Sequence, residues 1–115
     1  MTDVHILAMG PLQVSPDEAR RLFDELAAFT VDQPGVLAYS LHVDGDGTRG
    51  IIEEHYADFA TFEAHMAAMK TNRGFRTVAS LLTVTDFLVL DGDLERIKLR
   101  VGPIPVVGFR RVSGR

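Results

Sequence analysis

This chain of 115 residues contains no cysteine and no tryptophan. Without cysteine there can be no disulfide, thiolate nucleophile, thiolate zinc site or iron–sulfur cluster. Histidine and carboxylate side chains are then the remaining candidate metal ligands. Long apolar runs are also missing, since no segment approaches the roughly 20 residues that span a bilayer, and the N-terminus lacks the pattern of a secretion signal. We expect a cytoplasmic protein without a membrane partner.

The sequence also lacks an excess of positive charge. Its 12 basic and 16 acidic residues give a net charge of −4, which argues against nucleic acid as a partner. The charge is uneven, because residues 96–115 contain six basic residues and no acidic one. This basic segment either docks against a neighbouring subunit or forms a solvated edge that resists aggregation.

Two helices are predicted from their starting residues. Ser15 can cap a first helix, with Pro16 at its first position and Glu18 completing the capping box, and Pro34-Gly35 ends it. Asp58 can cap a second helix, which residues 72–74 interrupt before a further turn or two over residues 75–82. The apolar stripe of the second helix contains four residues at helical spacing, namely Phe59, Phe62, Met66 and Met69.

Apolar and β-branched runs predict strands between these helices; they cover residues 3–9, 36–44, 49–57, 84–90 and 106–112. The resulting order is that of a ferredoxin-like βαββαβ fold of the α+β class, an antiparallel sheet with both helices on one face. Residues 1–92 form this domain, and residues 93–115 form a C-terminal extension that packs on it or on a partner subunit. Because neither sheet face is strongly polar, we expect a homodimer that buries the second face as a dimeric α+β barrel.

His65 is the main candidate for chemistry. It falls at the edge of the apolar stripe of the second helix, where partial burial would lower the pKa of the imidazole and allow it to act as a base. Asn72 lies on the same side two turns further on and could donate to a developing oxyanion. The structural alternatives are a rim histidine bonded to backbone or water and an asparagine that ends the helix.

His55 and Tyr56 are adjacent in a strand, so their side chains point to opposite faces. If Tyr56 packs beneath His65, its phenol orients a substrate or is simply a core aromatic; if His55 does, Tyr56 belongs to the dimer interface. His5, His42 and His55 lie on strands that can be neighbours. Their spacing has no metal-ligand pattern, so we predict no metal site.

Two segments carry a family resemblance: Pro34-Gly35-Val36-Leu37-Ala38-Tyr39, and Glu54-His55-Tyr56-Ala57-Asp58 with Phe62-Glu63-Ala64-His65-Met66. Through them, residues 4–90 resemble the antibiotic biosynthesis monooxygenase family of small dimeric α+β barrel proteins. In this resemblance His65 matches the family's helix histidine, Tyr56 an aromatic position and Phe62 an apolar pocket wall. Haem-degrading relatives look dependent on a tryptophan, which this chain lacks.

The resemblance implies a cofactor-independent monooxygenase that acts with O2 on a small aromatic phenol, quinol or polyketide-like substrate. No cofactor is required, because a deprotonated phenol can itself supply electrons to O2. In this hypothesis His65 is the base and Tyr56 and Asn72 are polar anchors. Five further residues contact the substrate, namely Tyr39, His55, Phe62, Met66 and Met69. The alternatives are a non-catalytic dimeric ligand-binding or stress-related protein, and a collapsed pocket with structural histidines.

Overall fold

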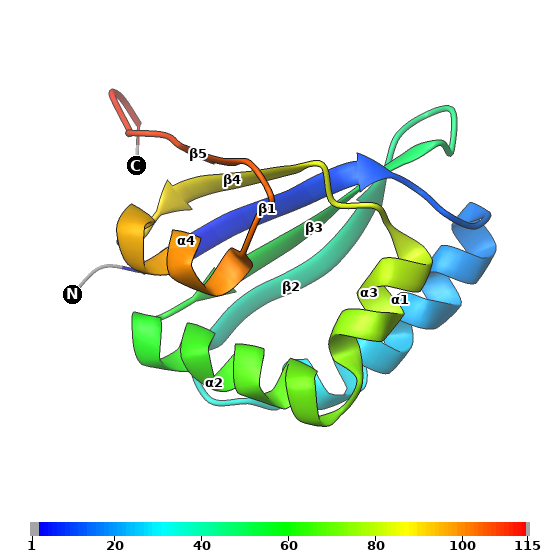
Figure 1. Ribbon diagram of the computed structural model, residues 1–115, viewed down its shortest axis with the longest axis horizontal. Helices are drawn as coiled ribbons and strands as arrows, with labels where there is room; N and C mark the ends of the chain where they lie inside the picture. The colour runs from blue at the N-terminus through cyan, green and yellow to red at the C-terminus, as the bar shows by residue number, and fades with distance from the viewer. Residues whose placement is uncertain (1–2, 115) are drawn as a thin grey trace.

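The elements follow the βαββαβ order of a ferredoxin-like fold, with an additional helix before the fourth strand and a further helix and strand after it (Figure 1). The computed structural model describes residues 3–114. Its elements are β1 (Val4–Pro11), α1 (Pro16–Thr30), β2 (Val36–Val43), β3 (Arg49–Tyr56), α2 (Phe59–Thr71), α3 (Gly74–Leu81), β4 (Asp86–Asp91), α4 (Leu94–Val101) and β5 (Val106–Gly108). Within residues 3–114, no helix has the length and apolarity needed to cross a membrane.

The sheet has five strands in the order β2-β3-β1-β4-β5. The first four pair antiparallel, which confirms the predicted ferredoxin-like arrangement. The fifth strand was expected only as part of an extension, and it pairs parallel with β4, so the sheet is mixed. The reason is the helix between them, because a crossover through α4 returns the chain in the same direction.

Both predicted helix starts are confirmed by their capping contacts. The Ser15 hydroxyl accepts a hydrogen bond from the backbone N–H of Glu18 at 3.2 Å. The Asp58 carboxylate accepts one from the N–H of Thr61 at 2.8 Å. Each cap satisfies a donor that the first turn of a helix leaves unpaired, so the two helices begin where the sequence places these residues.

The C-terminal region differs most from the prediction. Residues 94–101 form a helix capped by Asp93, and the last strand ends at Gly108 instead of residue 112. Gly92 has φ of 129°, and a Cβ there would lie 2.8 Å from Ile97 Cδ1, so glycine allows α4 to pack closely. Arg115, part of the predicted basic segment, lies outside the described residues.

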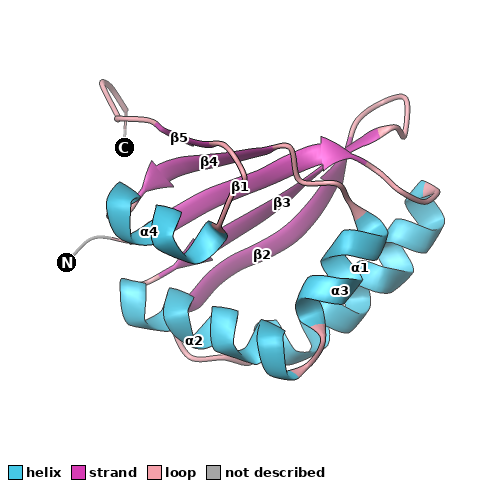
Figure 2. Cartoon of the chain, viewed as in Figure 1, coloured by secondary structure: helices cyan, strands magenta, loops and turns pink. Residues whose placement is uncertain are grey.

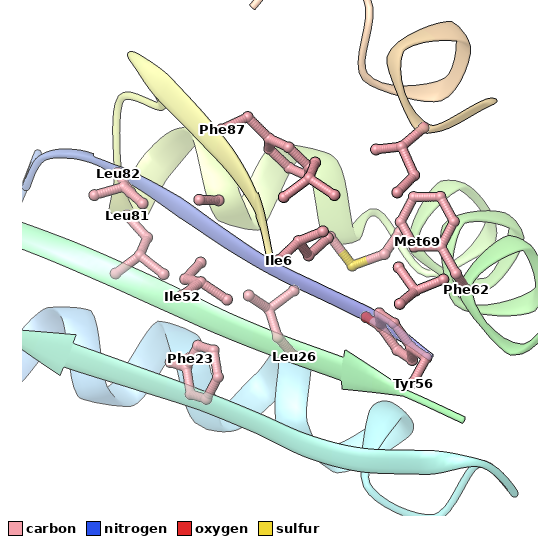
Figure 3. Close-up of a cluster of buried hydrophobic side chains, with 14 of the residues drawn as sticks. Ile6, Phe23, Leu26, Ile52, Tyr56, Phe62, Met69, Leu81, Leu82 and Phe87 are labelled. Atoms are coloured by element: carbon pink, nitrogen blue, oxygen red, sulfur yellow. The ribbon is translucent and has the colours of Figure 1, made fainter. Parts of the chain in front are cut away.

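The helices lie on one face of the sheet (Figure 2). Along β1, alternate residues Val4, Ile6 and Ala8 face the helices and are buried, while the residues between them are half-buried on the other face. Figure 3 shows how the buried side chains from strands and helices meet in one layer. The predicted stripe of α2 enters this layer, with Phe62 and Met69 buried.

Replacing Ile97 by Ala tests whether α4 is part of this core. Ile97 is fully buried, so the truncation should lower the free energy of unfolding by about 2–4 kcal/mol. Leu99, on the same helix, is 80% exposed, and Leu99→Ala should change it by less than about 0.5 kcal/mol. Chemical denaturation measures both changes in free energy. Equally small effects of the two substitutions would show that α4 is not packed in the core.

Candidate active site

A cavity of about 150 Å³ lies between the helix-facing side of the sheet and helices α2, α3 and α4. Most of its lining is apolar, and the apolar side chains come from β1, β3 and β4 and from all three helices; they include Ile6, Ile52, Met69, Phe75, Val78 and Phe87. Four polar side chains join them, from Tyr39, Glu54, His65 and Arg100. A cavity of this size accommodates about one aromatic ring.

Glu54 is the buried carboxyl group of this cavity. The alternation along β3 places Ile52, Glu54 and Tyr56 on the helix-facing side. The Tyr56 hydroxyl donates a hydrogen bond to Glu54 Oε1 at 2.6 Å. Burial raises the pKa of Glu54 to about 7, although the hydrogen bond from Tyr56 acts in the opposite direction. Glu54 can therefore bind and release a proton near neutral pH.

His65 is buried inside the core at 1% exposure, deeper than the edge position that the helical pattern indicates. Its Nε2 lies 3.6 Å from Glu54 Oε1, longer than a hydrogen bond. Among the described residues, its buried Nδ1 has no hydrogen-bond partner. Burial lowers the pKa of His65 to about 4. The imidazole is therefore neutral at pH 7, and its Nδ1 has an unused capacity for a hydrogen bond.

Tyr39 forms a third polar group beside the imidazole. Its ring makes an edge contact with His65, at 5.1 Å between centroids, and stacks on Phe23 at 5.0 Å. Burial, together with the negative charge of Glu54, raises the pKa of Tyr39 above its usual range. Its phenol stays protonated and can donate a hydrogen bond, so Glu54 is left as the group that changes charge near pH 7.

The structure brings four predicted site residues to the cavity wall, from β2 and α2, namely Tyr39, His65, Met66 and Met69. Tyr56 and Phe62 lie behind them, with the Tyr56 ring 5.4 Å from His65 and 5.8 Å from Phe62. Tyr56 therefore packs beneath His65, which settles the alternative left open by the sequence. The Tyr56 hydroxyl donates its hydrogen bond to Glu54.

His55 and Asn72 do not lie at this cavity. His55 is on the opposite face of the sheet, where its ring stacks on His5 at 4.3 Å and its Nε2 lies 2.9 Å from Asp3. Asn72 is exposed, and its amide donates to the Ala68 carbonyl at 3.0 Å. His55 lies on the opposite face because side chains alternate along a strand. Asn72 lies outside the cavity because it is the C-cap residue of α2.

Two of the four polar cavity residues, Glu54 and Arg100, were not predicted from the sequence. Glu54 could have been found, because the alternation that buries Ile52 and Tyr56 requires Glu54 to share their face. Arg100 could not have been found, because its helix follows a turn and the sequence predicted this segment only as part of an extension. Together with Tyr39 and His65, they are the ionisable side chains of an otherwise apolar lining, which makes them candidates for function.

The opposite face carries a separate polar group. Glu53 lies 2.9 Å from His5 and 3.7 Å from His42, and the hydrogen bond from His5 is the main cause that lowers its pKa. Within residues 3–114, no three His, Asp or Glu side chains are arranged to hold a metal ion. Adjacent carboxyl groups in β3 thus occupy contrasting environments, Glu53 charged and half-buried, Glu54 enclosed.

Comparison with known proteins identifies the family. The family model described as antibiotic biosynthesis monooxygenase matches residues 6–76, more than half of the chain. The chain therefore belongs to the antibiotic biosynthesis monooxygenase family, which supports a monooxygenase-type function. No curated protein matches this chain.

Solved structures of relatives share the fold. SnoaB, a cofactor-independent oxygenase from Streptomyces nogalater, is 19% identical over 80% of this chain and 90% of its own, with a TM-score of 0.63. MupZ from Pseudomonas fluorescens is 21% identical over 96% and 89%, with a TM-score of 0.62. Rv0793 from Mycobacterium tuberculosis is 20% identical over 81% and 94%, with a TM-score of 0.60.

The raised pKa of Glu54 predicts a pH-dependent stability. The folded value of about 7 lies above the ordinary 4.5, so stabilisation by the neutral acid is present below pH 4.5 and lost as pH rises through 7. This shift corresponds to about 3 kcal/mol. Between about pH 4 and pH 8, the free energy of unfolding of the wild type should therefore fall by about this amount relative to that of Glu54→Gln. Denaturation at each pH measures both values.

Glu53→Gln is the matched control on the opposite face. The pKa of Glu53 is lowered, so its charged form stabilises the fold above pH 4.5 and this contribution is lost as pH falls. Wild type should therefore gain stability relative to Glu53→Gln as pH rises. The same sign for both variants would show that Glu54 is not enclosed as described.

Proposed function

We propose that this protein is a cofactor-independent monooxygenase that converts a small phenol or quinol to a quinone with O2. The observation that carries the proposal is that Glu54, His65 and Tyr39 meet in one cavity that is otherwise largely apolar. A cavity built only to bind an apolar ligand needs no convergent titratable groups. The family match supports this class of reaction.

The proposed reaction needs a proton acceptor and a place for a phenolate. Glu54 takes the phenol proton, since its pKa near 7 makes it a stronger base than an imidazole with a pKa near 4. Neutral His65 and Tyr39 donate hydrogen bonds to the phenolate oxygen. The phenolate then supplies electrons to O2, and one oxygen atom leaves as water. In a phenol the other atom enters the ring as the second quinone oxygen, and in a quinol it enters as a hydroxyl group of the product quinone.

The size of the cavity limits the proposed substrate. At about 150 Å³ it encloses roughly one ring, so a larger polycyclic compound would have to extend through the opening. Apolar side chains such as Met66, Met69 and Phe87 would contact the ring faces. The substrate class that fits is therefore a monocyclic hydroxylated aromatic or the terminal ring of a larger one.

Oxygen uptake with a panel of monocyclic phenols and quinols, in the presence of a chelator and without added cofactor, tests the proposal. Wild type should show saturable uptake that increases as pH rises through about 7, because Glu54 must be ionised. Glu54→Gln should reduce kcat by about 10²–10⁴-fold and remove this pH dependence. His65→Ala should also lose turnover while remaining folded.

Asn72→Ala is the matched control, since Asn72 is exposed at the end of α2, and it should retain turnover. No uptake by well-folded wild type across the panel would favour the alternative of a non-catalytic ligand-binding protein. Loss of folding in His65→Ala, with Glu54→Gln fully active, would instead identify a structural histidine.

We also propose that the face opposite the helices pairs with the same face of a second copy. Leu7, Met9 and Leu88 are half-buried there in the single chain, although no helix among the described elements covers them. A second sheet would complete their burial and enclose the polar group around Glu53. This arrangement would form the dimeric α+β barrel that the sequence predicts.

Leu7→Glu tests this interface, because it places a charge at the centre of the face. Wild type should elute at about twice the 12.7 kDa chain mass in size exclusion with light scattering, and the variant at the monomer mass. Leu99→Glu, an exposed change on α4, is the control and should remain dimeric. A monomeric wild type would refute the proposed pairing.

We propose, finally, that residues 1–92 form the family domain and residues 93–115 an extension of it. The family model ends at residue 76, well before α4 begins. Ile97 of α4 is buried, and Arg100 and Val101 line the cavity. These contacts favour packing of the extension on its own domain over packing on a partner.

A further inference from the structure

Arg100 has an unusual position among the residues that line the cavity. It belongs to α4, and its side chain is 47% exposed while also contributing to the lining. A side chain that is both half exposed and part of the wall lies where the cavity meets solvent. Glu54, by contrast, is buried, with 9% of its surface exposed. The cavity therefore has an inner polar end at Glu54 and an outer cationic end at Arg100.

The guanidinium of Arg100 has capacity for another acceptor. Its Nη2 donates to Glu63 Oε2 of α2, and within residues 3–114 Glu63 is its one hydrogen-bond partner. An arginine carries five N–H donors in a planar fork that fits a carboxylate. An exposed ion pair contributes little to stability, so sharing the guanidinium with a ligand disturbs the fold little.

The charged side chains around the opening have a net charge that suits a monoanionic ligand. Arg96 lies 3.9 Å from the same Glu63 carboxylate and stacks over the Phe59 ring at 3.8 Å. Two guanidinium groups thus face one carboxylate, which leaves one net positive charge. A monoanion such as a carboxylate balances this charge, whereas a dianion such as a phosphate ester would leave one negative charge unbalanced.

We propose that Arg100 binds a carboxylate carried by the substrate, so that the substrate class is a hydroxylated aromatic acid. Its ring hydroxyl lies at Glu54 and His65, and its carboxylate lies at the opening beside Arg100. The carboxylate stays partly hydrated there, which avoids the desolvation penalty of a buried charge. This inference rests on the proposed function only in taking this cavity as the substrate site.

Calorimetric titration with 4-hydroxybenzoate and with phenol, in oxygen-free buffer at low salt, tests the inference. The two probes differ only in the carboxylate. Wild type should bind 4-hydroxybenzoate about tenfold tighter or more, since a charge-assisted hydrogen bond is made only to that probe. Arg100→Gln should reduce the ratio of affinities to about one, with phenol binding unchanged. Arg100→Lys keeps the charge but loses the fork, and should retain part of the ratio.

Lys98→Gln is the matched control, because Lys98 is a cation of the same helix that pairs with Glu95 and does not line the cavity. It should keep most of the preference for 4-hydroxybenzoate. An equal preference in wild type and Arg100→Gln, the absence of any preference in wild type, or the binding of neither probe would overturn the inference. If Arg100→Gln does not fold, an unchanged ratio in Arg100→Lys has the same consequence.

The outcomes separate this inference from the proposed chemistry. A tenfold ratio lost in Arg100→Gln, without oxygen uptake by any phenol, supports the carboxylate site and contradicts the oxygenase proposal. Oxygen uptake with phenol and 4-hydroxybenzoate alike, at equal affinity, contradicts the carboxylate site and leaves the oxygenase proposal standing.

Discussion

The structure of the site depends on the enclosure of one carboxyl group in an apolar layer. Transfer of Glu54 from water favours its neutral form, and this single desolvation accounts for its pKa near 7. The carboxyl keeps a partner in the Tyr56 hydroxyl, as a buried polar group requires. The same layer suppresses the charge of His65, so the imidazole is neutral at pH 7 and forms no ion pair with Glu54 when the carboxyl group ionises.

Much of the fold follows from local signals in the sequence. Ser15 and Asp58 begin their helices because a side-chain oxygen at the N-cap satisfies free amides, a local effect that a sequence displays directly. Helix α4 was not predicted, since an eight-residue helix obtains its stability from burying Ile97 in a core that only the tertiary structure supplies. The parallel pairing of β5 follows from that helix.

The site was predictable in part, for related reasons. Helical spacing indicates that His65 and Met69 share a face, and the structure places both at the cavity. The prediction for Asn72 relied on the same spacing. This spacing does not predict side-chain direction at the end of the helix, where the Asn72 amide donates a hydrogen bond to the Ala68 carbonyl. Arg100 depends on a contact between segments far apart in the chain, and no periodicity within one element records such a contact.

The central position of β1 fixes the order in which this molecule can be assembled. The first strand pairs with β4, so His5 and Asp91 are neighbours in the sheet although they lie far apart in the sequence. Closing such a long loop is slow relative to forming a helix or a hairpin. On the ribosome, β2 and β3 emerge before β4 has been synthesised, so their hairpin can form first. The cavity, which needs β4 and α4 as walls, therefore becomes competent to bind only after residues 86–101 have been synthesised.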